Sequence, residues 1–244
     1  MKKALKLLLP VLAALLVLAA GIGLYSYGPM LAMHPAETGQ IPLADGQVLA
    51  IRSGRGAMYL TDTGDGVLVI DAGTNAGKTE AALGKLGIDP ADVKWVLLTH
   101  SDHDHVAGLP LFPNAEIYMG EAELCLLDGT VNRNASGGNK LPDGIDLSAI
   151  KLLGDGEELL LGGARVKCIA APGHTPGSMA YLVNGSWLFA GDAFRYRKGE
   201  FTVHPFTMDE ALALQTIEKL PIHNRSADVI TVLTSHYGYI PSWL

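Results

Sequence analysis

The chain has 244 residues, with 18 Lys and Arg against 25 Asp and Glu, so its formal net charge is −7. It contains no run of basic residues, which argues against nucleic-acid binding through a positively charged face. About 200 residues follow an apolar N-terminal segment, and that length allows one large α/β domain with a substantial core.

The chain begins with a Lys-flanked apolar segment. Lys residues within the first six positions precede an uncharged run over residues 7–24, which as a helix would span about 27 Å, close to the thickness of a bilayer core. We therefore expect residues 1–28 to be a transmembrane anchor, with a cleaved signal segment as the alternative. Because the next Lys or Arg is Arg52, we expect the domain to lie in the periplasm or at the cell exterior, either anchored or, after cleavage, secreted.

A linker and one domain are predicted for the rest of the chain. Residues 29–45 contain Gly and Pro and are expected to be a linker, and residues 46–244 are expected to be the domain. Short apolar runs between Gly and Asp turns predict strands, and amphipathic runs that end at Gly or Pro predict helices. The expected strands are residues 48–52, 57–61, 66–71, 93–99, 115–119, 158–161, 164–170, 178–183, 187–190 and 229–233, and the expected helices are residues 77–86, 120–127 and 208–220. Two runs of strands, each followed by helices, predict two sheets with helices on their outer faces.

Residues 128–145 are rich in Gly and Asn and show no regular pattern. They are expected to be a mobile loop, and two roles stay open for it: a solvated connection or a lid over a substrate. The two cysteines, Cys125 and Cys168, are expected to be buried free thiols, with a disulfide as the alternative that an oxidising compartment would permit.

One predicted strand leads into a cluster of ligand-type side chains. Residues 93–99 are followed within six positions by His100, Asp102, His103, Asp104 and His105. Unpaired charges at a strand end would be costly, whereas imidazole and carboxylate are ligands that zinc, iron and manganese accept. Because alternate residues of an extended turn return to one side, His100, Asp102 and Asp104 are predicted to converge, with His105 beside them and His103 pointing away. That geometry suits two metal ions rather than one.

Three later strand ends carry further polar residues. His174 follows the strand expected at 164–170, Asp192 follows 187–190, and His236 follows 229–233. A single His at a turn is more often a hydrogen-bonded surface residue than a ligand. Together, the three add two imidazoles and one carboxylate at equivalent positions in the predicted topology.

The order of these motifs resembles that of the metallo-β-lactamase superfamily. The resemblance covers residues 46–241 and includes the strand at 67–71, the turn at 173–178 and the segment 189–192. It implies a four-layer αββα sandwich with a two-metal site at one edge. The ligands that it implies are His100, Asp102 and His174 for one metal, Asp104, His105 and His236 for the other, and Asp192 as a bridge.

Two positions refine the resemblance. Most relatives carry His where this chain has Asp102, and the His-x-Asp-x-Asp-His form is similar to a minor variant of the motif. Zinc is the first expectation, and the added negative charge makes the site harder and leaves iron or manganese open. An aspartate at 192 resembles the glyoxalase II and lactonase-like hydrolases, not the antibiotic-hydrolysing members with Cys or Ser there.

The resemblance implies a binuclear metal-dependent hydrolase, in which a metal-bridged hydroxide attacks an ester, lactone, thioester or related small substrate. Asp104 is assigned to catalysis as well as to metal binding, and no substrate-binding residue is assigned. Two alternatives remain open: an iron-dependent oxidoreductase similar to sulfur dioxygenases, and a non-catalytic metal-binding module anchored to a membrane. The expected partners are a small-molecule substrate and, through the N-terminal segment, a membrane, with no nucleic acid; the oligomeric state stays open.

Other residues near the motifs receive weaker assignments. Arg195, Tyr196 and Tyr237 follow ligand strands and are candidates for stabilising an oxyanion, although ordinary loop roles are expected for each. Asp71 is a candidate for orienting a ligand His. The remaining histidines, His34, His204 and His223, are expected at the surface.

Overall fold

The computed structural model describes residues 15–18, 21, 28–42, 47–133, 138–222 and 231–241. The chain divides into two compact units, Met1–Met33 and His34–Leu244. Most of the segment expected to be an anchor or signal, residues 1–28, lies outside the described residues. Within the described residues, no helix has both the length and the apolar character needed to cross a membrane.

A seven-stranded sheet takes its strands in chain order, from β1 to β7. Its strands are β1 (Gly39–Gln40), β2 (Val48–Ser53), β3 (Gly56–Asp62), β4 (Val67–Ile70), β5 (Val93–Leu97), β6 (Glu116–Gly120) and β7 (Lys151–Leu153). The first four pair antiparallel, and β4 to β7 run parallel. Parallel pairing requires crossovers, and helices supply them at α2 (Ala76–Leu86), α3 (His103–Val106) and α4 (Leu124–Leu127).

A six-stranded sheet forms the other half of the domain, in the order β15-β14-β11-β10-β9-β8. Its strands are β8 (Glu158–Leu161), β9 (Ala164–Ala170), β10 (Met179–Val183), β11 (Trp187–Gly191), β14 (Thr231–Thr234) and β15 (Tyr239–Pro241). Strands β11 and β14 pair parallel, with Gly191 opposite Thr234. The residues that follow these two strands, Asp192 and His236 among them, therefore leave the sheet at the same edge.

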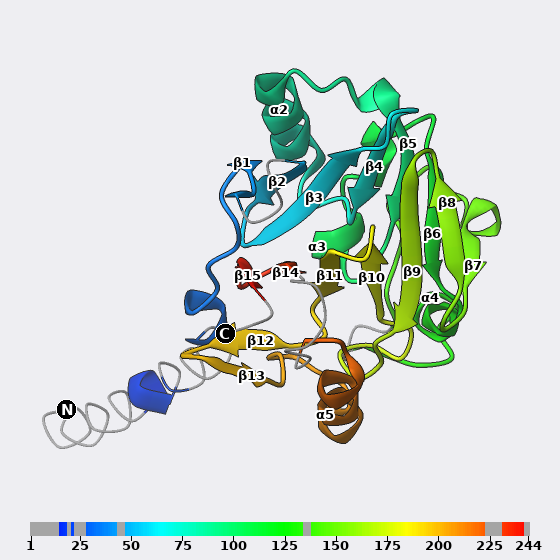
Figure 1. Ribbon diagram of the computed structural model, residues 1–244. Coiled ribbons are helices and arrows are strands. Elements are labelled where there is room, and N and C mark those ends of the chain that lie inside the picture. The colour runs from blue at the N-terminus through cyan, green and yellow to red at the C-terminus, as the bar shows by residue number, and fades with distance from the viewer. Residues whose placement is uncertain are drawn as a thin grey trace, which may run out of the picture. The chain divides into compact units, whose positions relative to one another are not determined.

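The two sheets pack face to face, with helices outside. Tyr59 and Leu97 of the first sheet share one apolar core with Phe189 of the second. Helix α2 packs on the outer face of the first sheet, and α5 (Glu210–Lys219) packs on the outer face of the second (Figure 1). This arrangement confirms the expected α/β sandwich with sheets inside and helices outside.

Two buried tyrosines connect the sheets at the strand ends. The hydroxyl of Tyr59 donates a 2.8 Å hydrogen bond to the carbonyl of Thr234. The hydroxyl of Tyr181 donates a 2.7 Å hydrogen bond to the carbonyl of Leu98. A tyrosine of each sheet therefore holds the end of a strand in the other sheet: Tyr59 holds the end of β14, and Tyr181 holds the residue after β5. Predicted ligands follow both of these strands.

The structure differs from the sequence-based expectations mainly in short elements. Within the expected linker, residues 29–45, β1 pairs with β2 and Ile41 is only 1% exposed, so packing begins before residue 46. Two-residue and three-residue strands carry too little periodicity to be recognised, and β1, β7, β15 and the hairpin of β12 (Arg195–Arg197) and β13 (Glu200–Thr202) were missed for this reason. The described part of the loop 128–145 contains no helix or strand. Both cysteines are free thiols, as expected, although only Cys168 is buried.

Candidate metal centre

The structure brings all the predicted ligand residues together at one edge of the sandwich. The segment after β5 carries four of them: His100, Asp102, Asp104 and His105. His174, Asp192 and His236 lie in the turns after β9, β11 and β14. Their ligand atoms fall into groups whose members lie within 4.8 Å of one another. The groups that match the prediction are His100 with Asp102 and His174, and Asp104 with His105 and His236.

The motif after β5 converges for a reason other than the one the spacing suggested. Asp102 is extended (φ −62°, ψ 146°), and the helical turn α3 begins at the next residue, His103. This change of conformation turns Asp104 and His105 inward and leaves His103 exposed. His103 therefore lies outside the ligand groups, as predicted, but because of a helical turn and not a continued extended chain.

The two groups have separations between polar atoms that suit a shared cation. In the first group, Asp102 Oδ2 lies 3.2 Å from His174 Nε2 and 3.5 Å from His100 Nε2. In the second group, His236 Nε2 lies 3.3 Å from Asp104 Oδ2, and His105 Nε2 lies 3.9 Å from Asp104 Oδ1.

Asp192 lies between the two groups. Its Oδ2 atom is 3.2 Å from His236 Nε2, 3.5 Å from His174 Nε2 and 3.6 Å from His105 Nε2. The carboxylate is therefore close to imidazoles of both groups, which is the position expected of a bridging ligand.

Neighbouring groups fix which nitrogen faces the centre in three of the rings, those of His100, His105 and His236. His105 Nδ1 lies 2.9 Å from Asp71 Oδ2, and His236 Nδ1 lies 2.7 Å from the carbonyl of Arg55. Because these oxygens accept a hydrogen bond from Nδ1–H, Nε2 is the nitrogen of each ring that faces the centre and binds an ion once its own proton has left. The predicted orienting role of Asp71 agrees with this contact. His100 is held in the same sense, since its Nδ1 lies 3.1 Å from the hydroxyl of Thr99, which itself donates to Asp71.

The donor set fits a divalent cation. His100 Nε2, His105 Nε2 and Asp192 Oδ1 are buried and have no hydrogen-bond partner among the described residues. Buried polar atoms without partners are rare and costly. Imidazole nitrogens and carboxylate oxygens that converge in this way are zinc ligands, so an ion would satisfy them.

The charged groups of the centre lower the pKa of its carboxyl groups and raise the pKa of two of its imidazoles. Burial opposes charge on Asp102, Asp104 and Asp192, but the surrounding imidazoles lower the pKa of each carboxyl below its ordinary value. Burial also opposes charge on His236, but Asp192 and Asp104 raise its pKa to about 10. His105 has its pKa raised well above 6.5, against burial, by Asp71 and its other carboxylate neighbours. The centre therefore holds excess negative charge that either protons or metal ions neutralise.

Glu123 fastens two ligand-bearing turns together and was not recognised from the sequence. Its buried carboxylate accepts hydrogen bonds from Ser101 N (2.8 Å) and Ser101 Oγ (2.7 Å), and from Thr175 Oγ1 (2.7 Å) and Gly177 N (3.0 Å). The close approach requires glycine, because a Cβ on Gly177 would lie 2.0 Å from the backbone nitrogen of Glu123. Glu123 thus positions the neighbours of Asp102 and His174 with one side chain.

The loop 128–145 reaches the first group through two side chains. Arg133 donates to both carboxylate oxygens of Asp102, and Asn139 donates to Oδ1 of Asp102 and to Ser101. Arg133 Nη2 also lies 3.1 Å from His174 Nε2, and its Nη1 donates to the carbonyl of Phe206. The described part of this loop therefore lies against the centre, which favours the lid of the two roles left open.

His204 corrects one expectation, because it is buried in the centre and not at the surface. It is 3% exposed, and its Nε2 lies 3.6 Å from Asp192 Oδ2. Its ring centroid is 4.8 Å from that of His174 and 5.5 Å from that of His236. Burial lowers the pKa of His204 to about 3, so its imidazole is neutral. Of the other histidines expected at the surface, His34 is exposed and His223 lies outside the described residues.

The remaining candidates differ in their contacts. Arg195 Nε donates to Thr202 across the β12–β13 hairpin, and Tyr196 packs on Phe201, so both have structural partners. The hydroxyl of Tyr237 is buried without a hydrogen-bond partner in the described part of the chain. Burial, followed by the charge of Asp192, raises the pKa of Tyr237 to about 12, which keeps the phenol protonated and able to donate.

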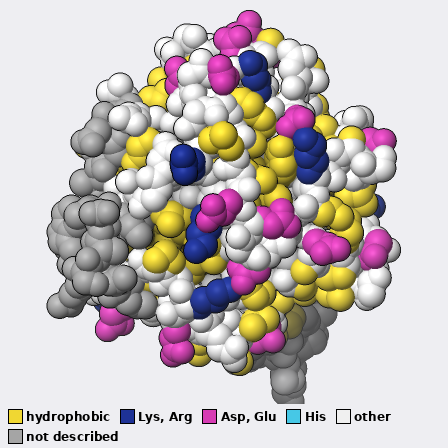
Figure 2. Space-filling view, turned by 45° about the vertical axis from the view of Figure 1, so that its right-hand side comes forward, with side chains coloured by type: hydrophobic (Ala, Val, Ile, Leu, Met, Phe, Trp, Pro, Cys, Tyr) yellow, Lys and Arg dark blue, Asp and Glu magenta, His cyan; other side chains and the backbone are white. Residues whose placement is uncertain are grey.

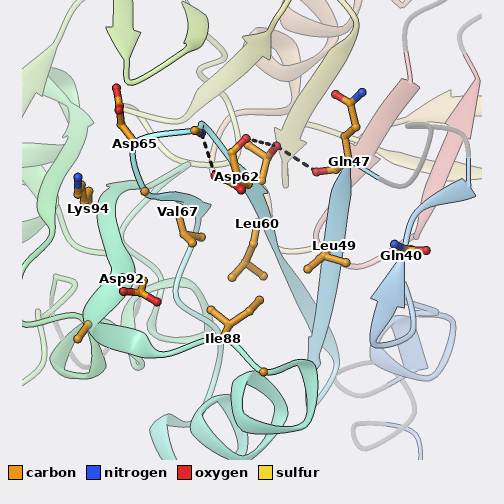
Figure 3. A pocket seen from close by; sticks show the side chains of 15 residues that line it. Gln40, Gln47, Leu49, Leu60, Asp62, Asp65, Val67, Ile88, Asp92 and Lys94 are labelled. Atoms are coloured by element: carbon orange, nitrogen blue, oxygen red, sulfur yellow. Dashed lines mark hydrogen bonds between the residues drawn. The ribbon is translucent and has the colours of Figure 1, made fainter.

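A cavity of about 830 Å³ lies apart from these ligands. Residues from β2, β3 and β4 and from the segment after α2 line it, and the side chains of Leu60 and Ile88 point toward each other within it (Figure 3). None of the predicted ligands lines this cavity. Figure 2 shows a face on which acidic and basic side chains are interspersed, in keeping with the absence of a basic run in the sequence.

Comparison with known proteins gives one family match and several relatives. The family model described as the metallo-beta-lactamase superfamily matches residues 52–223. The chain is 34% identical over 158 residues to the uncharacterized protein YobT of Bacillus subtilis (strain 168), which covers 58% of this chain and 63% of YobT. It is 32% identical over 151 residues to the hydroxyacylglutathione hydrolase of Acidiphilium cryptum (strain JF-5), which covers 62% of this chain and 49% of that protein. The chain thus spans less than two thirds of the length of either relative.

A solved structure shows the same architecture. The Rm3 metallo-beta-lactamase superposes with a TM-score of 0.61 at 24% sequence identity, covering 83% of this chain and 79% of that chain. At this level of identity the likeness concerns the fold.

Proposed function

The chain belongs to the metallo-beta-lactamase superfamily, and on that premise we propose that it is a metal-dependent hydrolase with a centre for two divalent ions. The observation that carries the proposal is the placement of the ligand atoms in two groups, on either side of the buried carboxylate of Asp192. When bound, divalent ions at such a centre lower the pKa of a water and polarise a carbonyl or phosphoryl oxygen of the substrate.

The second group would be formed by Asp104, His105 and His236, with Asp192 shared between the groups. The first group would be formed by His100 and His174 with a third ligand, and the sequence predicts Asp102 in that role. Zinc is the proposed ion, because three or more imidazoles with carboxylates are typical zinc ligands. Iron and manganese accept the same ligand types.

The three carboxylates of the centre differ in their exposure to solvent and therefore to a substrate. The side chain of Asp192 is 4% exposed and that of Asp102 18%, whereas that of Asp104 is 39% exposed. Asp104 is therefore the ligand carboxylate most accessible to an entering water or substrate. We assign it a catalytic role, in which it accepts a hydrogen bond from the entering group and holds that group in position.

The proposed substrate is an ester, lactone, thioester or related small molecule. The aspartate at position 192 and the similarity to a hydroxyacylglutathione hydrolase both support this class. The likeness to Rm3 concerns the fold and therefore does not favour β-lactams.

Metal analysis followed by a substrate panel tests the proposal. The purified protein should contain about two ions per chain, and it should hydrolyse at least one member of a panel of lactones, thioesters and esters in a chelator-sensitive way. A β-lactam and a phosphodiester serve as comparison substrates, and oxygen uptake with a persulfide detects the oxidoreductase alternative. A protein that binds no divalent ion, or that retains full activity without one, would refute the proposal.

We also propose, from the Lys residues and the apolar run alone, that residues 1–28 anchor the chain in a membrane or direct its export. Membrane fractionation of the full chain, followed by protease treatment of intact cells, tests this. A domain that fractionates with cytoplasmic markers and resists the protease would overturn it.

A further inference from the structure

In the first ligand group, the carboxylate of Asp102 is already engaged by hydrogen-bond donors. The Oδ1 atom of Asp102 accepts from Arg133 Nε at 3.0 Å and Asn139 Nδ2 at 2.8 Å. The Oδ2 atom of Asp102 accepts from Arg133 Nη2 at 2.8 Å and Arg133 Nε at 3.3 Å. A carboxylate has about four lone-pair sites, and these three donors, with His174 Nε2 at 3.2 Å from Oδ2, occupy most of that capacity. Its charge is also matched by the guanidinium, and the pair adds no net negative charge to the centre.

His204 has the opposite character, because it is buried and its Nε2 is unengaged. That atom has no hydrogen-bond partner among the described residues, and it lies 3.6 Å from Asp192 Oδ2. His204, His174 and Asp192 offer three ligand atoms within 4.8 Å of one another, and all three side chains are buried. A fully buried imidazole without a partner needs a function to explain its cost.

We propose that His174, Asp192 and His204 hold the first ion, and that Arg133 keeps Asp102 out of its coordination. The inference rests on the proposed function, since it requires that the centre binds divalent ions. His204 thus supplies the imidazole that the motif lacks at position 102. His100, whose Nε2 also has no partner in the described chain, stays available to either ion.

The contacts of Arg133 favour this assignment over one that includes Asp102. An ion at His174 requires Arg133 to release one contact, the 3.1 Å approach of Nη2 to His174 Nε2. An ion at Asp102 requires the release of charge-assisted hydrogen bonds from Arg133 and of the bond from Asn139. Arg133 is further fixed by its 2.8 Å hydrogen bond to the carbonyl of Phe206, two residues after His204.

Zinc stoichiometry in a set of variants tests the inference without measuring activity. The full chain is stripped with chelator and reloaded with zinc, excess metal is removed by dialysis, and bound zinc is measured by mass spectrometry. The variants are His204→Ala, Asp102→Asn and the double variant His204→Ala with Arg133→Ala. His103→Ala is the matched control, because this exposed histidine lies in the same motif outside the ligand groups. Circular dichroism of each variant establishes that it is folded.

The expected result is about two zinc ions for the wild type, His103→Ala and Asp102→Asn, and about one for His204→Ala. The double variant should regain the second ion, because removal of Arg133 frees Asp102 to act as a ligand. Two ions in His204→Ala, or the loss of one in Asp102→Asn, would overturn the inference and leave the proposed function standing. A folded wild type that binds no zinc would instead refute the proposed function. If a variant fails to fold, cobalt-substituted wild type decides: X-ray absorption should show five imidazoles shared between the two ions, and a total of four, without His204, would overturn the inference.

Discussion

Replacing Glu123 by Ala should lower the free energy of unfolding by about 2–6 kcal/mol. The substitution removes the acceptor of four hydrogen bonds in a site that is 0% exposed. The hydroxyl of Thr175 has another partner, Ser178 Oγ at 2.7 Å, and that of Ser101 can rotate. The backbone N–H groups of Ser101 and Gly177 cannot turn away, and each buried donor left without a partner costs about 1–3 kcal/mol.

Urea denaturation followed by circular dichroism measures this loss. In a domain of this size, 1 kcal/mol corresponds to about 2–4 °C, so the melting temperature should fall by at least about 4 °C. Glu121→Ala is the matched control, because Glu121 lies in the same turn, is exposed, and should change stability by no more than about 0.5 kcal/mol. Glu123→Gln should lose somewhat less, since the amide oxygen can serve one pair of donors while its NH2 group faces the other.

The Glu123→Ala variant should also bind zinc more weakly than the wild type. Glu123 holds Ser101 beside Asp102 and Thr175 beside His174, so its loss frees both turns and raises the cost of ordering the ligands. A change in stability of less than 0.5 kcal/mol with unaltered zinc affinity would refute the reasoning. It would mean that water replaces the carboxylate at all four donors.

Three further predictions concern the metal ions and the N-terminal segment. Asp192→Asn should impair binding of both ions and His236→Ala mainly of one, because Asp192 lies between the groups; equal loss of zinc in the two variants would contradict this assignment. Zinc binding at pH 7 should release about two protons, because His105 and His236 have raised pKa values and are protonated before metal binds. Calorimetry in buffers of different ionisation enthalpy measures the released protons. A heat of binding that does not depend on the buffer would contradict the prediction. Removal of residues 1–27 should leave a folded, zinc-binding domain, because the larger compact unit begins at His34; aggregation of the zinc-loaded product would show that the removed segment packs on the domain.

Local sequence patterns predicted the larger part of the fold. Strands such as β3 and β9 are four residues or longer and are bounded by Gly or Asp turns, so their type could be predicted. The ligands that follow β5, β9, β11 and β14 could be placed together because each comes directly after a strand. The hairpin β12–β13 was missed, and with it the return of the chain that brings His204 to the centre.

Long-range polar contacts could not be predicted in this way. Glu123 is 22 residues from Ser101 and 52 from Thr175, and Arg133 is 31 residues from Asp102. None of these residues belongs to a motif of fixed spacing, and a Glu or Arg in a loop is normally solvated. Their roles depend on the tertiary fold, which places Arg133, in the described part of the loop 128–145, against the turn after β5.

The origin of the ligands has a consequence for how the chain is held together. The second ligand group takes members from both halves of the domain: Asp104 and His105 from the segment after β5, and His236 from the turn after β14. A bound ion is thus a reversible cross-link between sequence-distant halves, comparable to a disulfide that closes a long loop. If the backbone were cut in the turn between β7 and β8, the two fragments would form a heterodimer whose affinity rises with free zinc concentration. The apolar core that the two sheets share, together with the hydrogen bonds of Tyr59 and Tyr181, would set the affinity that remains without metal.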